Sequence, residues 1–186
     1  MQKNTAQLPD WELVLSAAAR LQSILPDAVL GQLESVAGWK TARVQRPVQI
    51  LGSLDGIETG VRQLIREEPL ETQVVDCLGT RITLPTEGEI LRIKGVLILK
   101  RNATRDYLDF VALADHIGDE GVARALLPFD RLYRQANGES PLQQLQVQLA
   151  NALPYDLEET ELSEYKNLNP RWHDWQTVKT ACTHLA

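Results

Sequence analysis

Two helices joined by a very short connection, within residues 85–113, are the feature that most constrains the fold of this chain. Thr86 followed by Glu89 has the spacing of a capping box, in which each side chain accepts a backbone N–H of the first turn, and it predicts a helix from Glu87. The run to Arg101 is about four turns long. Because short connections join antiparallel neighbours, we expect the next helix to pack directly against this one. We expect Ile90, Ile93, Leu97 and Lys100 to line one face of the first helix. Leu91, Val96 and Ile98 widen its apolar surface.

Charged side chains gather around this turn. Lys94 lies in a helix whose apolar surface is wide enough to predict burial on most sides. Thr104 is expected to cap the second helix, and Asp106 in its first turn suits the positive end of the helix dipole. Antiparallel packing then brings Lys94 and Arg101 toward Asp109, which shares one side of the second helix with Asp106. These side chains are the candidate polar cluster.

A structural interpretation of the same residues stands beside the functional one. A lysine such as Lys94 in an apolar helix binds phosphate in some proteins, and about half the time it extends its amine to water or pairs with an acid at the core edge. Arg105 and Asp109 form an i,i+4 pair of the kind that stabilises ordinary helices by only a few tenths of a kcal/mol. Spacing alone favours the structural interpretation of this pair, because ion pairs on helix surfaces are common.

An acidic residue and apolar positions precede a lysine here, and an arginine and then Arg-Asp-x-x-Asp follow it. This order resembles the C-terminal motifs of the AbiEii-type nucleotidyltransferase toxins, and the likeness covers roughly residues 10–125. The matching positions are Glu89, Lys94, Arg101, Arg105, Asp106 and Asp109. The resemblance implies catalytic roles for Lys94 and Asp109. It implies nucleotide binding for Lys94, Arg101, Arg105 and Asp106.

Two motifs on which the chemistry of that family depends are missing. A Gly-Gly or Gly-Ser turn lets backbone N–H groups approach a triphosphate, and an Asp-x-Asp pair holds Mg²⁺ against its phosphates. The sequence contains no Asp-x-Asp, and the segment expected to carry both motifs is absent between Leu30, at the start of the first strand, and Gly31, which opens a helix. Gly52-Ser53 with Asp55 imitates the motifs, but turns explain its glycines better.

The remaining pattern predicts an α+β fold: a truncated nucleotidyltransferase-like mixed sheet flanked by helices, with a helical C-terminal extension. Strands are expected at 41–45, 48–51, 57–65, 72–78 and 81–84. Further helices are expected at 11–25, 31–37, near 120–126, at 142–153 and at 172–185. We therefore divide the chain into an incomplete α/β domain, 1–126, and a helical extension, 127–186.

Composition narrows the class of protein. With 44% hydrophobic and 24% charged residues, a chain of 186 residues can bury a substantial core. Its net charge of −6 argues against broad nucleic-acid binding. We expect a soluble, cytoplasmic protein without a membrane partner, because the sequence shows no signal-peptide pattern and no apolar run that could span a bilayer. Cys77 and Cys182 lack metal-ligand spacing, and no metal-binding residues are assigned.

The resemblance leads to two functions of different class. The favoured one is a degenerate, catalytically impaired scaffold that binds a nucleotide or a partner, since phosphoryl transfer without carboxylate ligands loses positioning and charge neutralisation. The alternative is an active toxin that uses Mg²⁺ and a nucleoside triphosphate to transfer a nucleoside monophosphate to protein or RNA. In that case Asp76 is the lone metal ligand beside Asp106 or Asp109. The expected partners are an antitoxin or another protein, and a second copy of the chain that covers the sheet edge left by the missing segment.

Overall fold

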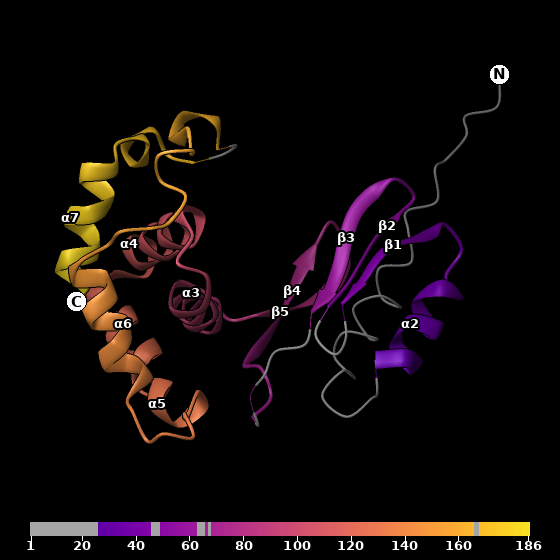
Figure 1. Ribbon diagram of the computed structural model, residues 1–186. Helices are drawn as coiled ribbons and strands as arrows, with labels where there is room; N and C mark the ends of the chain where they lie inside the picture. The colour runs from indigo at the N-terminus through magenta and orange to yellow at the C-terminus, as the bar shows by residue number, and fades with distance from the viewer. Residues whose placement is uncertain (1–25, 46–48, 63–65, 67, 166–167) are drawn as a thin grey trace. The chain divides into compact units, whose positions relative to one another are not determined.

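The computed structural model describes residues 26–45, 49–62, 66, 68–165 and 168–186, and Figure 1 labels their helices and strands. The chain divides into two compact units, of which the first comprises residues 1–69 and 75–83 and the second residues 70–74 and 84–186. The predicted α+β class is confirmed, although two small antiparallel sheets take the place of one mixed sheet. The predicted domain boundary at residue 126 falls inside the second unit, at the end of one of its helices.

A helix and a three-stranded meander form the core of the first unit. The elements are α2 (Pro26–Glu34), β1 (Trp39–Gln45), β2 (Gln49–Leu54) and β3 (Ile57–Arg62), and β2 pairs antiparallel with both other strands. Their buried side chains pack into one cluster: Val29, Leu33, Trp39, Ile50, Leu54 and Val61. The indole N–H of Trp39 donates to Thr41 (2.9 Å), whose hydroxyl donates to Glu34 (3.2 Å) and so links β1 to α2.

The start of this unit differs from the expectation. The predicted helix at 11–25 lies outside the described residues. The predicted first strand before Leu30 is wrong, because Val29 and Leu30 belong to α2 and pack on the sheet. The helix predicted at 31–37 is the second half of α2, which ends at Glu34.

The three glycines of the meander have different causes. Asp55 and Gly56 have φ values of 50° and 83°, as the two-residue turn between β2 and β3 requires. Gly52 lies inside β2, where a Cβ would come within 2.6 Å of the Trp39 ring. Gly60 lies inside β3, where a Cβ would come within 2.8 Å of the Leu51 side chain. A turn therefore explains only Gly56, and the imitation of a phosphate-binding turn at Gly52 is part of a paired strand.

A second hairpin is shared between the two units. It consists of β4 (Thr72–Cys77) and β5 (Thr80–Pro85). Leu78 and Gly79 form its turn with φ values of 53° and 83°, and Asp76 Oδ1 accepts from the Gly79 N–H at 3.0 Å. Asp76, the predicted lone metal ligand, thus holds the hairpin turn.

Two long helices, α3 (Glu87–Arg101) and α4 (Thr104–Leu126), begin the helical part of the second unit. The bounds of α3 agree with the prediction. Three contacts show that the two helices are antiparallel. Arg101, at the end of α3, pairs with Asp106 in the first turn of α4, and Glu87, at the start of α3, pairs with His116 further along α4. The pair of Lys94 and Asp109 lies between these two. Gly118 (φ 71°, ψ 167°) kinks α4, so the predicted helix near 120–126 is the second part of this one element.

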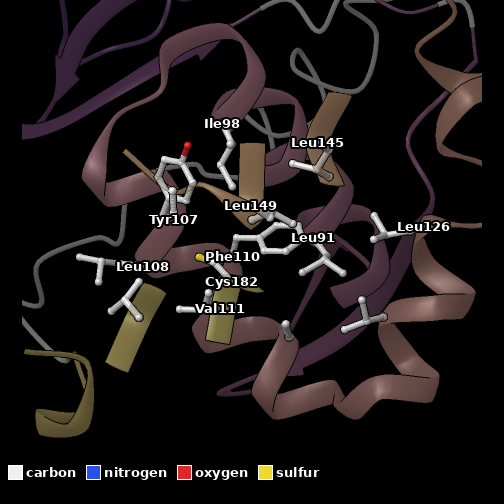
Figure 2. Close-up of a cluster of buried hydrophobic side chains, with 14 of the residues drawn as sticks. Leu91, Ile98, Tyr107, Leu108, Phe110, Val111, Leu126, Leu145, Leu149 and Cys182 are labelled. Atoms are coloured by element: carbon white, nitrogen blue, oxygen red, sulfur yellow. The ribbon is translucent and has the colours of Figure 1, made fainter. Parts of the chain in front are cut away.

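Shorter elements complete the second unit. They are α5 (Phe129–Leu132), α6 (Pro141–Ala150), the 3₁₀ turns η1 (Leu162–Glu164) and η2 (Pro170–His173), and α7 (Trp175–Leu185). Figure 2 shows part of the core that they enclose with α3 and α4. It includes Leu91, Ile98, Tyr107, Phe110, Leu145 and Cys182. Within the part of the chain that the structure describes, no helix is long and apolar enough to cross a membrane.

The most buried side of α3 is not the face predicted as its centre. Ile90 is exposed and Leu97 is only half-buried. Leu91 and Ile98, predicted to widen the apolar surface, are buried with Gly95 at helical spacing. Gly95 explains the rotation, because a Cβ at this position would lie 2.9 Å from Leu145 and 3.2 Å from the Phe129 ring. The absence of a side chain lets α6 and Phe129 approach α3 closely. A search for apolar residues at helical spacing does not count glycine, so it centres the buried face of α3 on other residues.

This close approach predicts the effect of a larger residue. Gly95→Leu should lower the free energy of unfolding by about 1–3 kcal/mol, because the new side chain overlaps Leu145 and Phe129. Urea denaturation followed by circular dichroism measures the change. Gly88→Ala is the matched control in the same helix: its Cβ would meet Ala125 at an ordinary 3.4 Å, so it should be neutral or stabilise by up to about 1 kcal/mol. Equal destabilisation by both variants would contradict the close packing at Gly95.

Candidate functional site

The connection between α3 and α4 sets the geometry of the predicted polar cluster. Asn102 ends α3 in the left-handed conformation (φ 49°, ψ 38°), and its N–H donates to the Ile98 carbonyl. Ala103 is the N-cap residue of α4 and makes no side-chain capping bond, so the predicted cap by Thr104 is wrong. Asp156 replaces it by accepting from the Thr104 N–H and hydroxyl, both at 2.7 Å. A carboxylate from a distant loop thus neutralises the start of α4.

The five predicted site residues meet in two ion-paired groups at this turn. The amine of Lys94 lies 2.5 Å from Asp109 Oδ2, and Arg105 Nε lies 3.8 Å from the same oxygen. Arg101 donates from Nε and Nη2 to the two oxygens of Asp106, at 3.0 and 2.7 Å. The structure therefore brings together the side chains that the sequence grouped, and each cation among them faces a carboxylate.

Burial decides what these pairs do. The Asp106 side chain is fully buried, and its negative charge costs several kcal/mol to desolvate unless a cation and hydrogen bonds compensate. Arg101 supplies both. Lys94 and Asp109 remain partly exposed, and a phosphate would have to displace Asp109 to bind this lysine. The arrangement is typical of counter-ions that allow two helices to pack.

Asn102 is a central residue that the sequence interpretation passed over as a break in the pattern. Its side-chain oxygen accepts from the Tyr107 hydroxyl (2.6 Å) and from Gln148 (2.8 Å). Its side-chain amide donates to the Leu153 carbonyl (2.8 Å), and its own carbonyl accepts from the Tyr155 N–H (3.0 Å). These bonds attach the segment after α6 to the end of α3. The sequence signal for this role is an asparagine directly after the last helical residue, because asparagine adopts the left-handed conformation at the end of a helix more readily than most residues.

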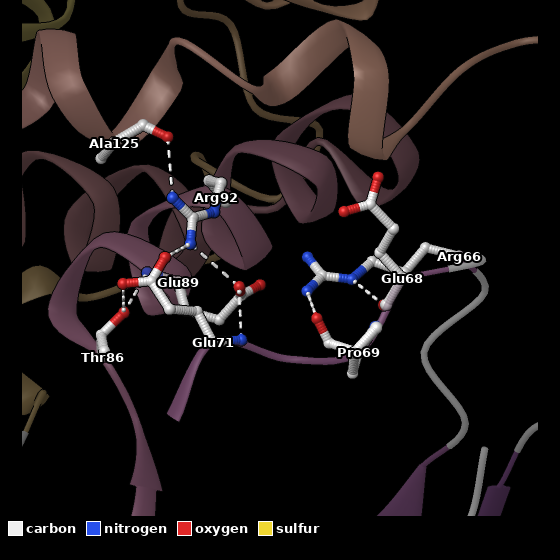
Figure 3. Close-up of polar contacts among 8 residues, drawn as sticks. All are labelled: Arg66, Glu68, Pro69, Glu71, Thr86, Glu89, Arg92 and Ala125. Atoms are coloured by element: carbon white, nitrogen blue, oxygen red, sulfur yellow. Dashed lines mark hydrogen bonds and ion pairs between the residues drawn. The ribbon is translucent and has the colours of Figure 1, made fainter. Parts of the chain in front are cut away.

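A second charged group, at the start of α3, was not predicted. Arg92 Nη2 contacts Glu89 Oε2 at 2.9 Å and Glu71 Oε2 at 2.7 Å, and its Nη1 donates to the Ala125 carbonyl at 3.0 Å (Figure 3). The side chains of Arg92 and Glu89 are almost wholly buried. Although burial alone lowers it, the two carboxylates raise the pKa of Arg92, so this side chain stays charged. The group joins the strand entry at Glu71 to α3 and α4.

This network also corrects the predicted capping box. The Thr86 hydroxyl accepts from the Glu89 N–H at 3.2 Å, as predicted. The return bond is not made, because Glu89 Oε2 accepts from Arg92 and from the Glu71 N–H (3.1 Å). The Thr86 N–H donates instead to the Glu71 carbonyl (2.9 Å). Glu89, the acidic residue of the nucleotidyltransferase resemblance, is therefore a buried partner of an arginine.

Two of the three histidines make exposed pairs. His116 lies 3.1 Å from Glu87, and His184 lies 3.3 Å from Asp119. Nearby, Arg171 pairs with Asp115, and this lowers the pKa of the Asp115 carboxyl. Among the residues that the structure describes, no group of three or more His, Cys, Asp and Glu side chains could hold a metal ion.

Comparison with known proteins finds relatives that are named for transport, uptake or export. It is 30% identical, over 220 aligned positions, to the "Heme uptake protein MmpL11" of Mycobacterium tuberculosis and to the "Probable transport protein MmpL11" of Mycobacterium bovis. These alignments cover 95% of this chain but 22% of each relative, so the chain spans about a fifth of their length. It is 33% identical over 124 positions, 65% of this chain and 13% of the relative, to the "Mycolic acid-containing lipids exporter MmpL11" of Mycolicibacterium smegmatis. No family model and no solved structure matches.

These relatives overturn the predicted function. Both the impaired nucleotidyltransferase scaffold and the active toxin are wrong, and the toxin–antitoxin interpretation falls with them, because the relatives are named as transport proteins. The resemblance to AbiEii-type toxins rested on charges at helical spacing, which here are counter-ions between packed helices. The Mg²⁺ and nucleoside triphosphate, and the roles given to Lys94 and Asp109, stay predictions that depended on that resemblance.

The two ion pairs predict unequal effects on stability. Arg101→Met should lower the free energy of unfolding by about 3 kcal/mol, because it leaves the buried Asp106 carboxylate without its cation. Lys94→Met should cost less than about 1 kcal/mol, because its pair with Asp109 is partly exposed and screened by water. Urea denaturation at neutral pH compares the two variants. A Lys94 variant as unstable as the Arg101 variant would contradict the counter-ion assignment.

The buried thiol on α7 predicts a dependence of stability on alkaline pH. Burial raises the pKa of Cys182 from 9.0 to about 12, so the native state keeps a proton that the unfolded chain loses. The resulting stabilisation is complete below pH 9 and is lost toward pH 12, with a slope of about 1.4 kcal/mol per pH unit. Cys182→Ala should remove this slope, whatever its effect at neutral pH. Denaturation curves across this range test it, and parallel pH profiles for the two proteins would contradict it.

Proposed function

We propose that this chain works as a segment of a membrane transport protein of the MmpL11 kind, beside the membrane and not across it. The observation that carries the proposal is the similarity to MmpL11 proteins over 95% of the chain. Because that similarity runs through both compact units, it supports a role that uses the whole chain and not one motif.

The architecture supports a segment that folds outside the bilayer. The helical unit and the meander each have a hydrophobic cluster of their own, which is how a domain keeps its shape when it is attached to a larger protein. The described helices include none that could cross a membrane. The buried charges of the helical unit are paired and suit an interior bounded by water more than by lipid.

The proposal places the segment on the cytoplasmic side. Cys77 is exposed and Cys182 is buried, and both are free thiols. Thiols persist unpaired in the reducing cytoplasm, whereas oxidising compartments favour disulfides. The protein partner proposed here is the remainder of the transport protein. Pairing with a second copy of the chain also stays a proposal, and measuring the mass of the purified chain in solution tests it.

An exchange of segments tests the proposed function. In Mycolicibacterium smegmatis, the part of MmpL11 that aligns with this chain is deleted in one strain and replaced by this chain in another. Deletion should abolish export of mycolic acid-containing lipids, and replacement should restore most of it, because the segment supplies a function that the membrane part lacks. Lipids at the cell surface, separated by thin-layer chromatography, give the readout.

Two further strains serve as controls. Replacement by a chain with Phe110→Asp should fail, because this side chain is fully buried in the helical core and the charge unfolds it. Replacement by a chain with Lys100→Gln, an exposed position, should restore export like the unaltered chain. Normal export after deletion would overturn the proposal. So would loss of export by a chimera that reaches the membrane in normal amount.

A further inference from the structure

The three-stranded meander has two faces, and one of them lies opposite the face that packs into the hydrophobic cluster with α2. The pairing register puts Ile50, Leu54 and Val61 on the face that α2 covers, where all three are buried. Because side chains alternate along a strand, the residues between them lie on the opposite face. We name this opposite face the open face. Its central strand contributes Leu51 and two polar side chains that are half-buried between their neighbours.

The open face carries most of the cations of the described meander. Lys40 pairs across the strands with Ser53, Arg43 with Leu51, and Arg62 with Gln49, so all three project from this side. Each is exposed, and among the described residues none of them makes an ion pair or a side-chain hydrogen bond. Glu58 is the one carboxylate that the register places on this face.

The contrast with the helical unit shows why these cations are informative. Around the turn between α3 and α4, Lys94 and Arg101 already contact Asp109 and Asp106. On the open face three cations stand beside the single carboxylate of Glu58, although the chain as a whole carries a net charge of −6. This face would therefore attract an anionic surface that the net charge of the chain repels.

The shape of the face suits a flat partner. Arg43 and Arg62 lie on the two outer strands, about 10 Å apart across the sheet. Leu51 lies between them on the central strand, and its side chain occupies the space that a Cβ at Gly60 of β3 would fill. The cations thus lie on both outer strands of the face, beside a central strand that carries no charge on this side.

We propose that the open face binds the anionic phospholipid headgroups of a membrane surface through Lys40, Arg43 and Arg62. The proposal rests on the proposed function for the presence of a membrane, and the cytoplasmic leaflet is the one that carries anionic lipid. It revises the expectation that the chain has no membrane partner. A single-stranded nucleic acid is the less suitable occupant, because sheet surfaces that bind one stack its bases on aromatic side chains, and the described open face has none.

Sedimentation of the purified chain with lipid vesicles tests this inference. The chain should bind vesicles of phosphatidylcholine mixed with phosphatidylglycerol at low salt, and should bind neither phosphatidylcholine alone nor the mixed vesicles at high salt. A variant with Lys40→Gln, Arg43→Gln and Arg62→Gln should bind the mixed vesicles roughly a hundredfold more weakly, since each cation contributes separately. Circular dichroism verifies that the variant is folded.

The matched control removes the same charge from the helical unit. A variant with Lys100→Gln, Arg124→Gln and Arg134→Gln, all exposed positions, should bind the vesicles nearly as well as the unaltered chain. Equal losses in the two variants would mean that net charge alone matters and would overturn the proposal. Absence of binding to the mixed vesicles at low salt would also overturn it.

Two further results separate this inference from its alternatives. Binding of single-stranded RNA that the open-face variant abolishes, without binding to vesicles, would assign the face to nucleic acid and overturn the lipid proposal. The vesicle experiment contains no transporter. If the chain does not bind vesicles but the chimera restores export, this inference is overturned and the proposed function is left intact. Vesicle binding by the purified chain, together with a chimera that does not restore export, would overturn the proposed function and leave this inference intact.

Discussion

The packing of α3 against α4 is the interaction on which the helical unit depends. The two helices bury an apolar face, and they also enclose the Asp106 carboxylate and the Arg92 guanidinium. Each charge has its partner, Arg101 in the first case and Glu89 in the second. Because an unpaired buried charge costs several kcal/mol, the Arg101–Asp106 pair excludes registers of the two helices in which these partners do not meet.

The turn between the helices connects this packing with the rest of the unit. Asn102 can end α3 abruptly because its left-handed backbone is tolerable for asparagine, and its side chain then holds the segment that follows α6. Asp156, from that same segment, neutralises the start of α4. Two residues at the turn thus bind a loop some fifty positions away, which gives the polar side chains of the turn a structural role.

The packed helices and the meander differ in how their cations are paired, and this difference underlies the proposal that the open face binds lipid. Where α3 packs against α4, Arg92, Lys94 and Arg101 compensate carboxylates and support the fold. In the meander, Lys40, Arg43 and Arg62 face outward without partners among the described residues. A cationic sheet face agrees with the proposed position beside a membrane, where anionic lipid would attract it.

The sequence by itself determined the local structure: the bounds of α3, the approximate places of the described strands and the α+β class follow from periodicity, capping and turn residues. It also placed Lys94 beside Asp109, because a short connection fixes which helix faces meet, whereas Arg101 pairs with Asp106 instead of Asp109. Tertiary structure alone decided which face of α3 is buried, since the space left by Gly95 is filled from α5 and α6. It likewise decided that the carboxylates of Glu89 and Asp106 are buried beside arginines, because burial depends on elements distant in the chain and is not encoded in the spacing of neighbouring residues.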